Sequence, residues 1–336
     1  MSKVYSSQEK RSKNLRYAAV ILAVVFAVSA ILLFVNIWEK HRNEFAGNDS
    51  GTVSTDLEYK GKEYRLREDV QTVLVLGLDK FEMPDVESYN NDKQADFMML
   101  LVVDHGNESV TALHINRDTI AEMNILGVAG DVVGTVEKQI ALAHTYGNGK
   151  EMSCRNAADA VSGLLMNVEI DHYVSVTMDA VSVYNDFLGG VELTVLDDFS
   201  GIDDTLVEGE TVTLFGEHAL NYVRTRYGLD DSTNSRRMVR QRQYIEALYE
   251  KTLATLENDD DFIVKAASKL ADYIVSDYTG TGLQTLAEKI MGYQFVEIRE
   301  LEGRNVRGDE HMEFYPDEDS VKETVISLFY ELKEAE

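Results

Sequence analysis

An arginine-rich stretch is the first part of this chain whose residue types could carry chemistry. The stretch contains no lysine, and its six arginines are Arg224, Arg226, Arg236, Arg237, Arg240 and Arg242. Arginine offers a planar fork of donors that matches phosphate or carboxylate oxygens, and it stays charged at any relevant pH. On a helix, Arg237, Arg240 and Gln241 would share one face. Clustering alone leaves two interpretations open: a site for an anionic ligand, or a surface helix paired with carboxylates.

Carboxylates lie at the ends of three apolar runs that we expect to be buried strands. Asp79 follows the first run, Asp96 opens the second, and Arg117-Asp118 ends the third. Ligands of open α/β sheets bind where strands end. Two carboxylates beside arginines suit a divalent metal that holds a phosphate group, because Mg²⁺ takes one or two carboxylates plus phosphate oxygens. Taken singly, each aspartate is better explained as a turn or a helix cap.

Other reactive residue types add no site of their own. His144 has no partner at metal-ligand spacing and is expected to be structural, and the single cysteine, Cys154, is expected to pack near a helix start. The sequence has no nucleophile elbow, zinc-protease motif or Walker A loop. The net charge of -27, from 59 acidic and 32 basic residues, argues against a general nucleic-acid binder.

The elements that must position these residues follow from hydrophobic patterning. Short apolar runs at 70–79, 96–104 and 109–118 indicate strands buried on both faces, with a hairpin turn at 105–108. Helices are expected over 156–166, 178–188, 216–225, 235–257, 262–275, 281–291 and 320–332, and further strands over 191–195 and 295–298. In the longest helix, Val239 and Leu248 are expected to face inward. Strands interleaved with helices predict an α/β layered domain.

The N-terminal part of the chain predicts a membrane anchor. Residues 17–38 are almost all apolar and long enough to cross a bilayer, and the basic residues of the tail at 1–16 place that tail in the cytoplasm. The rest of the chain is then extracytoplasmic, beginning with a polar spacer at 39–69. A cleaved signal peptide is the alternative, although no cleavage-type site follows the apolar run.

Taken in order, several segments resemble the LytR-CpsA-Psr family of cell-envelope proteins. The resemblance covers residues 70–256, and residues 257–336 are expected to complete the same domain. It is carried by VLVLGLDK, QADFMMLLVVD, ALHINRDT, IDHYVSVTMDAV, LGGVELTV, GEHALNYVRTR and SRRMVRQRQYIEAL.

The resemblance implies an α/β/α fold and an enzyme that moves a glycopolymer from an undecaprenyl-pyrophosphate carrier onto peptidoglycan, forming a phosphodiester. It implies that Asp79 and Asp96 hold Mg²⁺ (or Mn²⁺) or act on the acceptor hydroxyl. The pyrophosphate would be gripped by Arg117, Arg224, Arg226, Arg237, Arg240 and Gln241. Arg236 and Arg242 lie outside the family's pattern and are expected to be structural.

Two positions depart from the family's pattern. The family usually has Arg-Ser-Asp where this chain has Gln94-Ala95-Asp96, and Ile-Pro-Arg-Asp where it has Ile115-Asn116-Arg117-Asp118. The first change removes a positive group beside the expected metal site. A non-catalytic protein that binds or senses polyprenyl-pyrophosphate precursors, or a prenyl pyrophosphatase, is therefore kept as an alternative function.

Overall fold

The computed structural model describes residues 56–78, 91, 93–127, 129–225, 234–256, 262–278, 286, 289–290, 293–308 and 311–333. The predicted anchor, Asp79 and Arg226 lie outside the described residues. The chain divides into two compact units. We name Lys40–Ser175, Val275–Asp277 and Ile298–Glu336 the sheet unit, and Val176–Ile274 with Tyr278–Glu297 the helical unit. Within the described ranges, no helix is long and apolar enough to cross a membrane.

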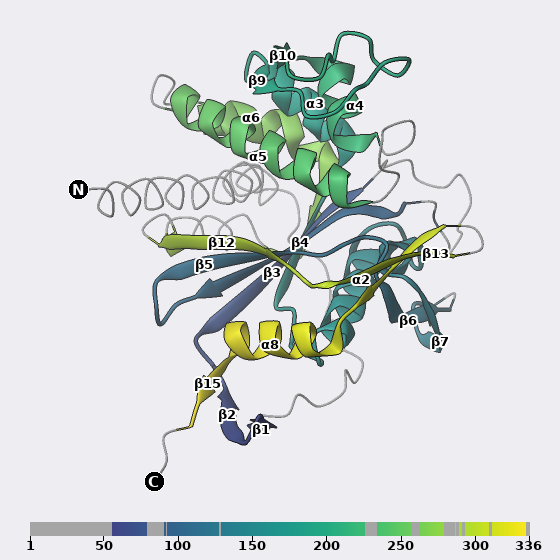
Figure 1. Ribbon diagram of the computed structural model, residues 1–336, viewed down its shortest axis with the longest axis vertical. Helices are drawn as coiled ribbons and strands as arrows, with labels where there is room; N and C mark the ends of the chain where they lie inside the picture. The colour runs from purple at the N-terminus through teal and green to yellow at the C-terminus, as the bar shows by residue number, and fades with distance from the viewer. Residues whose placement is uncertain are drawn as a thin grey trace. The chain divides into compact units, whose positions relative to one another are not determined.

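Six strands form the main sheet, in the order β11-β8-β3-β4-β5-β12 (Figure 1). Their bounds are β3 Val70–Leu78, β4 Ala95–Asp104, β5 Ser109–His114, β8 His172–Thr177, β11 Ile274–Ser276 and β12 Gln294–Glu300. The β3–β4 and β4–β5 pairs are antiparallel, and the turn between β4 and β5 covers 105–108. The three apolar runs form strands as the sequence predicts, although the third ends at His114 instead of residue 118, and most of their residues are buried.

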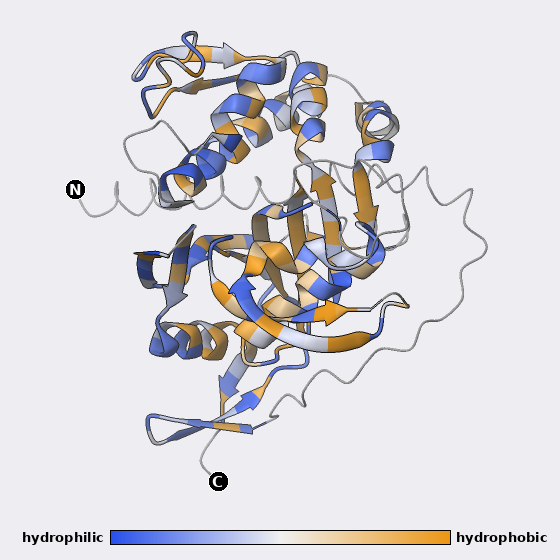
Figure 2. Ribbon diagram, turned by 90° about the vertical axis from the view of Figure 1, so that its right-hand side faces the viewer, coloured by the Kyte–Doolittle hydropathy of each residue, from blue (hydrophilic) through white to orange (hydrophobic). Residues whose placement is uncertain are grey.

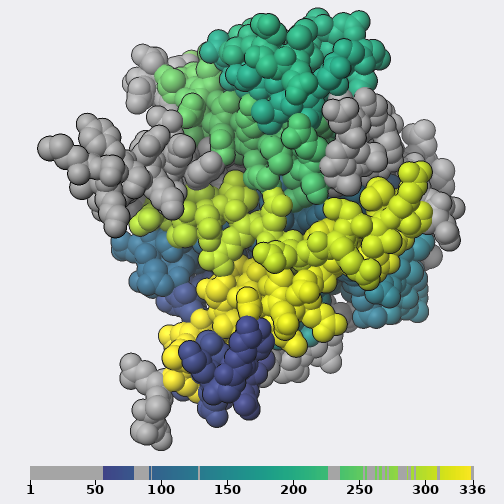
Figure 3. Space-filling model, in the orientation of Figure 1, coloured from purple at the N-terminus to yellow at the C-terminus, as the bar shows by residue number. Residues whose placement is uncertain are grey.

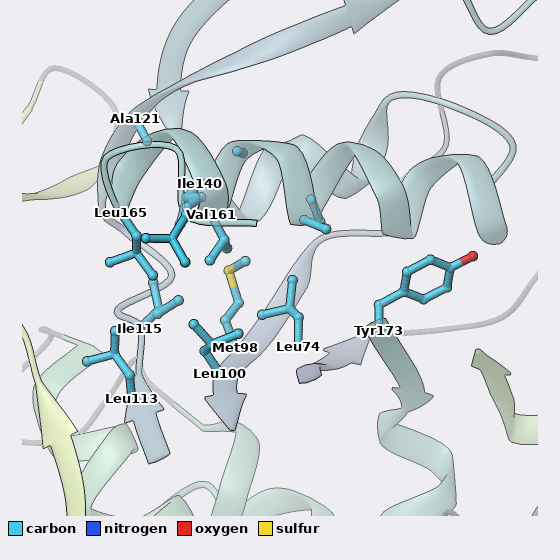
Figure 4. Close-up of a cluster of buried hydrophobic side chains, with 14 of the residues drawn as sticks. Leu74, Met98, Leu100, Leu113, Ile115, Ala121, Ile140, Val161, Leu165 and Tyr173 are labelled. Atoms are coloured by element: carbon cyan, nitrogen blue, oxygen red, sulfur yellow. The ribbon is translucent and has the colours of Figure 1, made fainter. Parts of the chain in front are cut away.

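One face of these strands packs on helix α2, Glu151–Leu164. Side chains alternate between the two faces of a strand, so every second residue of β3, β4 and β5 points toward this helix. Figure 4 shows Leu74, Met98 and Leu113 from the three strands gathered beneath Val161 of α2. The α2 helix begins five residues before the predicted start at 156, and Cys154 is buried in this core as expected.

The predicted spacer at 39–69 is partly wrong, because residues 56–66 form two strands. β1 Asp56–Tyr59 and β2 Lys62–Leu66 pair antiparallel, and β2 also pairs with β15, Tyr330–Leu332. Figure 3 shows the C-terminal residues (yellow) directly beside this hairpin (purple). The predicted helix at 320–332 accordingly ends early: α8 covers Glu318–Phe329, and the last residues are strand.

Two further hairpins and a short helix belong to the sheet unit and escaped the sequence patterns. They are β6 Ile120–Leu126 with β7 Val132–Gln139, β13 Gly303–Arg307 with β14 Met312–Pro316, and the 3₁₀ helix η1 Ile140–Thr145. Residue Phe314 of β14 forms a parallel bridge with Thr119. This bridge brings a C-terminal hairpin against the turn that carries Arg117.

The helical unit contains helices α3 to α6 and a two-stranded sheet. Their bounds are α3 Met178–Phe187, β9 Val191–Thr194, β10 Thr211–Leu214, α4 Gly216–Arg224, α5 Asn234–Leu256 and α6 Phe262–Leu270. The predicted helix at 262–275 ends at Leu270, and a 3₁₀ turn and β11 follow. In α5, Leu248 packs inward as expected, whereas Val239 is 38% exposed. The buried face of α5 instead carries Met238, Tyr244 and several of the polar residues discussed below.

Candidate functional site

Asp96 sits on an irregularity at the start of β4. Gly77 pairs with Phe97, but its neighbour Leu78 pairs with Ala95, so Asp96 is an extra residue on its strand. Such a β-bulge locally bends the strand and re-aims a side chain, and bulges are common beside active sites. The bulge allows Ala95 to join the apolar core on α2 while Asp96 stays 9% exposed.

Arg117 lies in the turn that follows β5 and meets Asp96. Its Nη1 forms an ion pair with Oδ1 of Asp96, its Nη2 donates to Oε1 of Gln94, and its Nε lies 3.5 Å from Oδ1 of Asp118. The side chain is almost buried. The structure therefore brings together two of the predicted site residues, Asp96 and Arg117, at the ends of neighbouring strands.

Side chains from the turn itself fix the course of its backbone. Asn116 Oδ1 accepts from the backbone N–H of Asp118 at 3.0 Å, and Thr119 Oγ1 donates to the carbonyl of Asn116 at 2.6 Å. Asparagine favours such turns because its side chain mimics a backbone acceptor. Asn116 thus fixes the turn at the position where the family's pattern has proline.

Gln139, the last residue of β7, also stabilises the turn that carries Arg117. Its Nε2 donates to Oδ1 of the fully buried Asp118 at 2.9 Å and to the carbonyl of Met312 at 2.7 Å. The backbone N–H of Phe314 donates to the carbonyl of Asp118 at 2.8 Å. These contacts join the β13–β14 hairpin to the Arg117 turn across nearly 200 residues of sequence, and no local pattern predicts them.

A buried polar network holds the segment that leads into β4. Asn91 donates through Nδ2 to the carbonyls of His144 and Thr145 at 3.0 and 3.1 Å, and His144 Nδ1 lies 2.9 Å from the carbonyl of Lys93. Burial lowers the pKa of His144 to about 4, so the ring is neutral and Nδ1 is the donor. His144 is structural, as the sequence predicts, while the role of Asn91 was missed.

Arg240 is the most deeply buried of the predicted pyrophosphate ligands, at 1% exposed. Its Nη1 donates to Oδ2 of Asp197 at 2.5 Å, its Nε to the carbonyl of Tyr222 at 3.0 Å, and its Nη2 to the carbonyl of Thr225. The guanidinium also lies over the ring of Phe199. All three side-chain nitrogens of Arg240 thus bind groups of the protein. This arrangement does not favour a direct contact between Arg240 and a ligand, and that contact stays a prediction.

Gln241 makes a similar contact with the end of α4. Its Nε2 donates to the carbonyl of Val223 at 3.2 Å. The last carbonyls of a helix have no partner within the helix, and a cation near them is favourable. Arg240 and Gln241 therefore cap α4 and fix the direction in which the chain leaves Arg224, another predicted ligand.

The remaining arginines of the cluster divide between buried and exposed positions. Arg237 is buried, Arg224 is half-buried, and both make further interactions. Arg236 pairs with Asp197 and donates to the carbonyl of Leu196 at 3.1 Å, which confirms its expected structural role. Asp96 and Arg117 belong to the sheet unit, whereas Arg224, Arg236, Arg237, Arg240 and Gln241 belong to the helical unit.

The part of the chain that the structure describes contains no cluster of three or more histidine, cysteine, aspartate or glutamate side chains able to hold a metal. Of the two predicted metal ligands, Asp96 is described and Asp79 is not. The chemistry of Asp96 nevertheless suits Mg²⁺, which needs only one or two carboxylates when phosphate oxygens and water complete its shell.

The fold and the strand-end pair define an α/β domain that presents an aspartate and an arginine from adjacent strands. A model of the LytR_cpsA_psr family matches residues 33–329, so the chain belongs to that family. This match confirms the resemblance that the sequence motifs carry. The chain is an enzyme of the LytR-CpsA-Psr (LCP) type, since teichoic acid transferases are among its relatives.

Two of these relatives are TagU proteins, described as polyisoprenyl-teichoic acid–peptidoglycan teichoic acid transferases. The one from Enterococcus faecalis is 28% identical over 239 residues, which cover 70% of this chain and 72% of the relative. The one from Halalkalibacterium halodurans is 32% identical over 185 residues, which cover 55% of this chain and 54% of the relative. The second match therefore spans about half of that protein.

Solved structures share the fold. The crystal structure of Bacillus subtilis TagV has a TM-score of 0.57 and 21% identity, and the match covers 78% of this chain and 97% of TagV. TagT bound to LI-WTA also has a TM-score of 0.57 at 21% identity, over 78% of this chain and 90% of TagT. At this identity the likeness shows the α/β fold alone.

Proposed function

We propose that this chain moves a glycopolymer, such as a teichoic acid or a capsule, from an undecaprenyl-pyrophosphate carrier to peptidoglycan and forms a phosphodiester. Family membership and the TagU relatives support this proposal. The observation that carries it in this chain is the ion pair of Asp96 and Arg117, held on a β-bulge and a strand-end turn. A rigid frame for one carboxylate and one guanidinium suits phosphoryl chemistry, which depends on positioning and charge neutralisation.

In the proposed reaction, a peptidoglycan hydroxyl attacks the phosphorus next to the glycan. The bond between that phosphorus and the bridging oxygen breaks, and polyprenyl phosphate leaves with the bridging oxygen and its electron pair. Arg117 stabilises the negative charge that shifts onto the pyrophosphate, because its planar fork matches phosphate oxygens. Asp96 either accepts the proton of the attacking hydroxyl or holds the metal. Arg224, Arg226 and Arg237 are further proposed ligands of the pyrophosphate, with Arg240 and Gln241 positioning the end of α4.

Mg²⁺ or Mn²⁺ is the proposed cofactor. Asp96 would hold it together with Asp79, and the ion would supply positive charge to the phosphate oxygens. The proposed place of action is the outer surface of the cell membrane. A donor whose polyprenyl tail lies in the bilayer must be met there, and the predicted helix at 17–38 would keep the enzyme within reach.

The proposal is tested with the full chain in detergent, a lipid-linked pyrophosphate donor with a labelled glycan, Mg²⁺ and a peptidoglycan fragment. We expect label to move to the fragment, and Arg117→Lys to lower the rate roughly 10²-fold, because lysine cannot reproduce the fork. Arg67→Lys is the matched control. Arg67 binds Asp104 at the other end of β4 with distances of 2.5 and 2.6 Å, so its loss should leave the rate unchanged.

Other outcomes would point to other functions. Release of the label as glycan phosphate without any acceptor would favour a pyrophosphatase. Donor binding without transfer, together with an unaltered cellular phenotype for Asp96→Ala, would favour a binding or sensing protein. Equal rates for Arg117→Lys and Arg67→Lys would contradict the assigned role of Arg117.

A further inference from the structure

Gln94 occupies the position where the family's pattern has arginine, and its amide oxygen contacts Arg117. Oε1 of Gln94 accepts a hydrogen bond from Nη2, while Asp96 pairs with Nη1 and Asp118 lies 3.5 Å from Nε. Each of the two terminal nitrogens of the guanidinium therefore contacts an oxygen acceptor directly, and the oxygen of Asp118 lies beside Nε at longer range. Two of these acceptors are carboxylates, and Gln94 is the neutral one.

We propose that Gln94 is a positioning residue, which holds the Arg117 guanidinium in the plane that faces Asp96 and thereby aims it at the transferring phosphate. This inference rests on the proposed function for the identity of the ligand. It does not depend on that function for the coupling between Gln94 and Arg117, which is a property of the folded chain.

The backbone of Gln94 is fixed independently of Arg117. The preceding residue, Lys93, offers its carbonyl to Nδ1 of His144 at 2.9 Å, and its N–H donates to Oδ1 of Asn91 at 3.0 Å. The following residue, Ala95, is fully buried and already paired with Leu78 in the sheet. Because both neighbours are held by the core, the backbone position of Gln94 does not depend on Arg117, and the Gln94 side chain can orient the guanidinium.

A neutral acceptor suits this position better than the alternatives. An arginine at 94 would place a second cation against the guanidinium, and like charges repel strongly where water is largely excluded. A methionine has almost the same shape but would leave a nearly buried N–H without its acceptor, which is costly. Glutamine satisfies the donor and adds no charge.

Glutamine at position 94, in place of the arginine of the family's pattern, also changes the charge that an anionic donor meets. Gln94, Asp96, Arg117 and Asp118 together carry a formal charge of about -1, whereas an arginine at 94 would make it about zero. This chain therefore offers one positive charge fewer near Arg117. We expect its donor binding to rely more on the orientation of Arg117 and on added cations.

The first experiment measures transfer by the full chain in detergent. Gln94→Met should lower kcat about tenfold, because the misaligned guanidinium stabilises the transition state less well. Gln94→Glu keeps the acceptor, so kcat should recover, but its added negative charge should raise KM for the donor several-fold. Gln71→Met is the matched control, since Gln71 lies 3.2 Å from His105 at the far end of β3 and should change neither constant. A Gln94→Met enzyme within twofold of the native kcat would overturn the proposal.

The second experiment separates failure of this inference from failure of the proposed function. Urea unfolding of the native chain, Gln94→Met, Arg117→Lys and the double variant forms a double-mutant cycle. The midpoint of the double variant should fall by clearly less than the sum of the two single shifts, since both single variants lose the same hydrogen bond between Gln94 and Arg117. Additive shifts would overturn the coupling. If the native chain transfers no glycan while the cycle shows coupling, the proposed function fails and the positioning role stands.

Discussion

The two ends of β4 each carry an ion pair between an arginine and an aspartate, Arg67–Asp104 and Arg117–Asp96, and the two arginines have different sets of partners. Burial alone would raise the pKa of Asp104, but hydrogen bonds from Arg67 and Asn107 outweigh it and hold the pKa at about 2. Both carboxylate oxygens of Asp104 face Arg67, which also donates to Asp69, and these contacts join the segment before β3 to the end of β4. At the other end, the two terminal nitrogens of Arg117 contact two different residues, Asp96 and Gln94. A guanidinium shared in this way can exchange one acceptor for a phosphate without losing the other.

His144 predicts a specific dependence of stability on pH. Its pKa is lowered from 6.5 to about 4 by burial, so the folded protein binds the proton less tightly than the unfolded chain. The stabilisation that the neutral ring provides is complete above pH 6.5 and is lost as pH falls toward 4, at up to about 1.4 kcal/mol per pH unit.

His144→Asn tests this, because the amide can still donate to Lys93 but does not titrate. The free energy of unfolding in urea should fall more steeply in the native chain than in the variant between pH 6.5 and 4.5. Parallel curves would show that His144 is not the titrating group.

Arg236 and Arg240 share one carboxylate, which allows a direct comparison of an exposed and a buried ion pair. The Arg236 side chain is 47% exposed, so Arg236→Met should cost about 0–1 kcal/mol of unfolding free energy. Arg240→Met breaks a buried pair and uncaps α4, so it should cost about 3–5 kcal/mol. Thermal or urea unfolding of the two variants measures the difference. Equal losses would mean that burial does not govern the strength of this network.

At the scale of elements, continuous apolar runs were the most informative pattern. β3 and β4 were predicted to within one residue, because a strand buried on both faces shows as a continuous apolar run, whereas β5 ends four residues before the predicted end at 118. β1 and β2 were missed because they are short and lie in a polar stretch without a continuous apolar run, and Figure 2 shows this hairpin as largely hydrophilic (blue). The Lys60-Gly61 turn, with both φ angles positive, was the signal that could have revealed it.

The candidate site was predictable only in part. Strand ends located Asp96 and Arg117, and the structure confirms that these two residues meet. The helix pattern of α5 misplaced Val239, because buried arginine and glutamine replace apolar residues on the inner face. The contacts of Gln94, Asn91 and Gln139 described above join segments 21 or more residues apart, so no local pattern could contain them.

The β-bulge at Asp96 predicts that position 77 requires glycine, because the backbone there lies very close to the neighbouring strand. A Cβ at Gly77 would lie 2.8 Å from Cβ of Phe97, so Gly77→Ala should push the strands apart and cost about 1–3 kcal/mol. Gly134→Ala in β7 is the control, since nothing lies within 4 Å of its Cβ position. Urea unfolding should show a loss for the first variant alone. A neutral Gly77→Ala would contradict this account of the bulge.

At the scale of the whole chain, the acidic charge constrains how an anionic donor can be recognised. A net charge of -27 repels a polyanion at long range, but salt screens this repulsion beyond about 10 Å at 0.1 M ionic strength. Contacts with nearly buried groups such as Arg117 are screened far less. Under the proposed function, recognition of the donor would therefore depend on a few enclosed arginines, and tethering to the membrane that carries the donor would offset the unfavourable long-range field.

The predicted anchor can be tested with the chain's own cysteine content. Cys154 is fully buried and burial raises its pKa to about 12, so the native thiol should not react with maleimide at neutral pH. A cysteine introduced by Ser50→Cys should be labelled on intact cells by a membrane-impermeant maleimide. One introduced by Ser6→Cys should react only after permeabilisation, because the basic residues near it are predicted to keep that end in the cytoplasm. Labelling of Ser6→Cys alone on intact cells would reverse the orientation, and a shortened chain that lacks the Ser6 position would establish a cleaved signal peptide. The expected pattern would place Asp96 and Arg117 on the side of the membrane where peptidoglycan lies, as the proposed transfer requires.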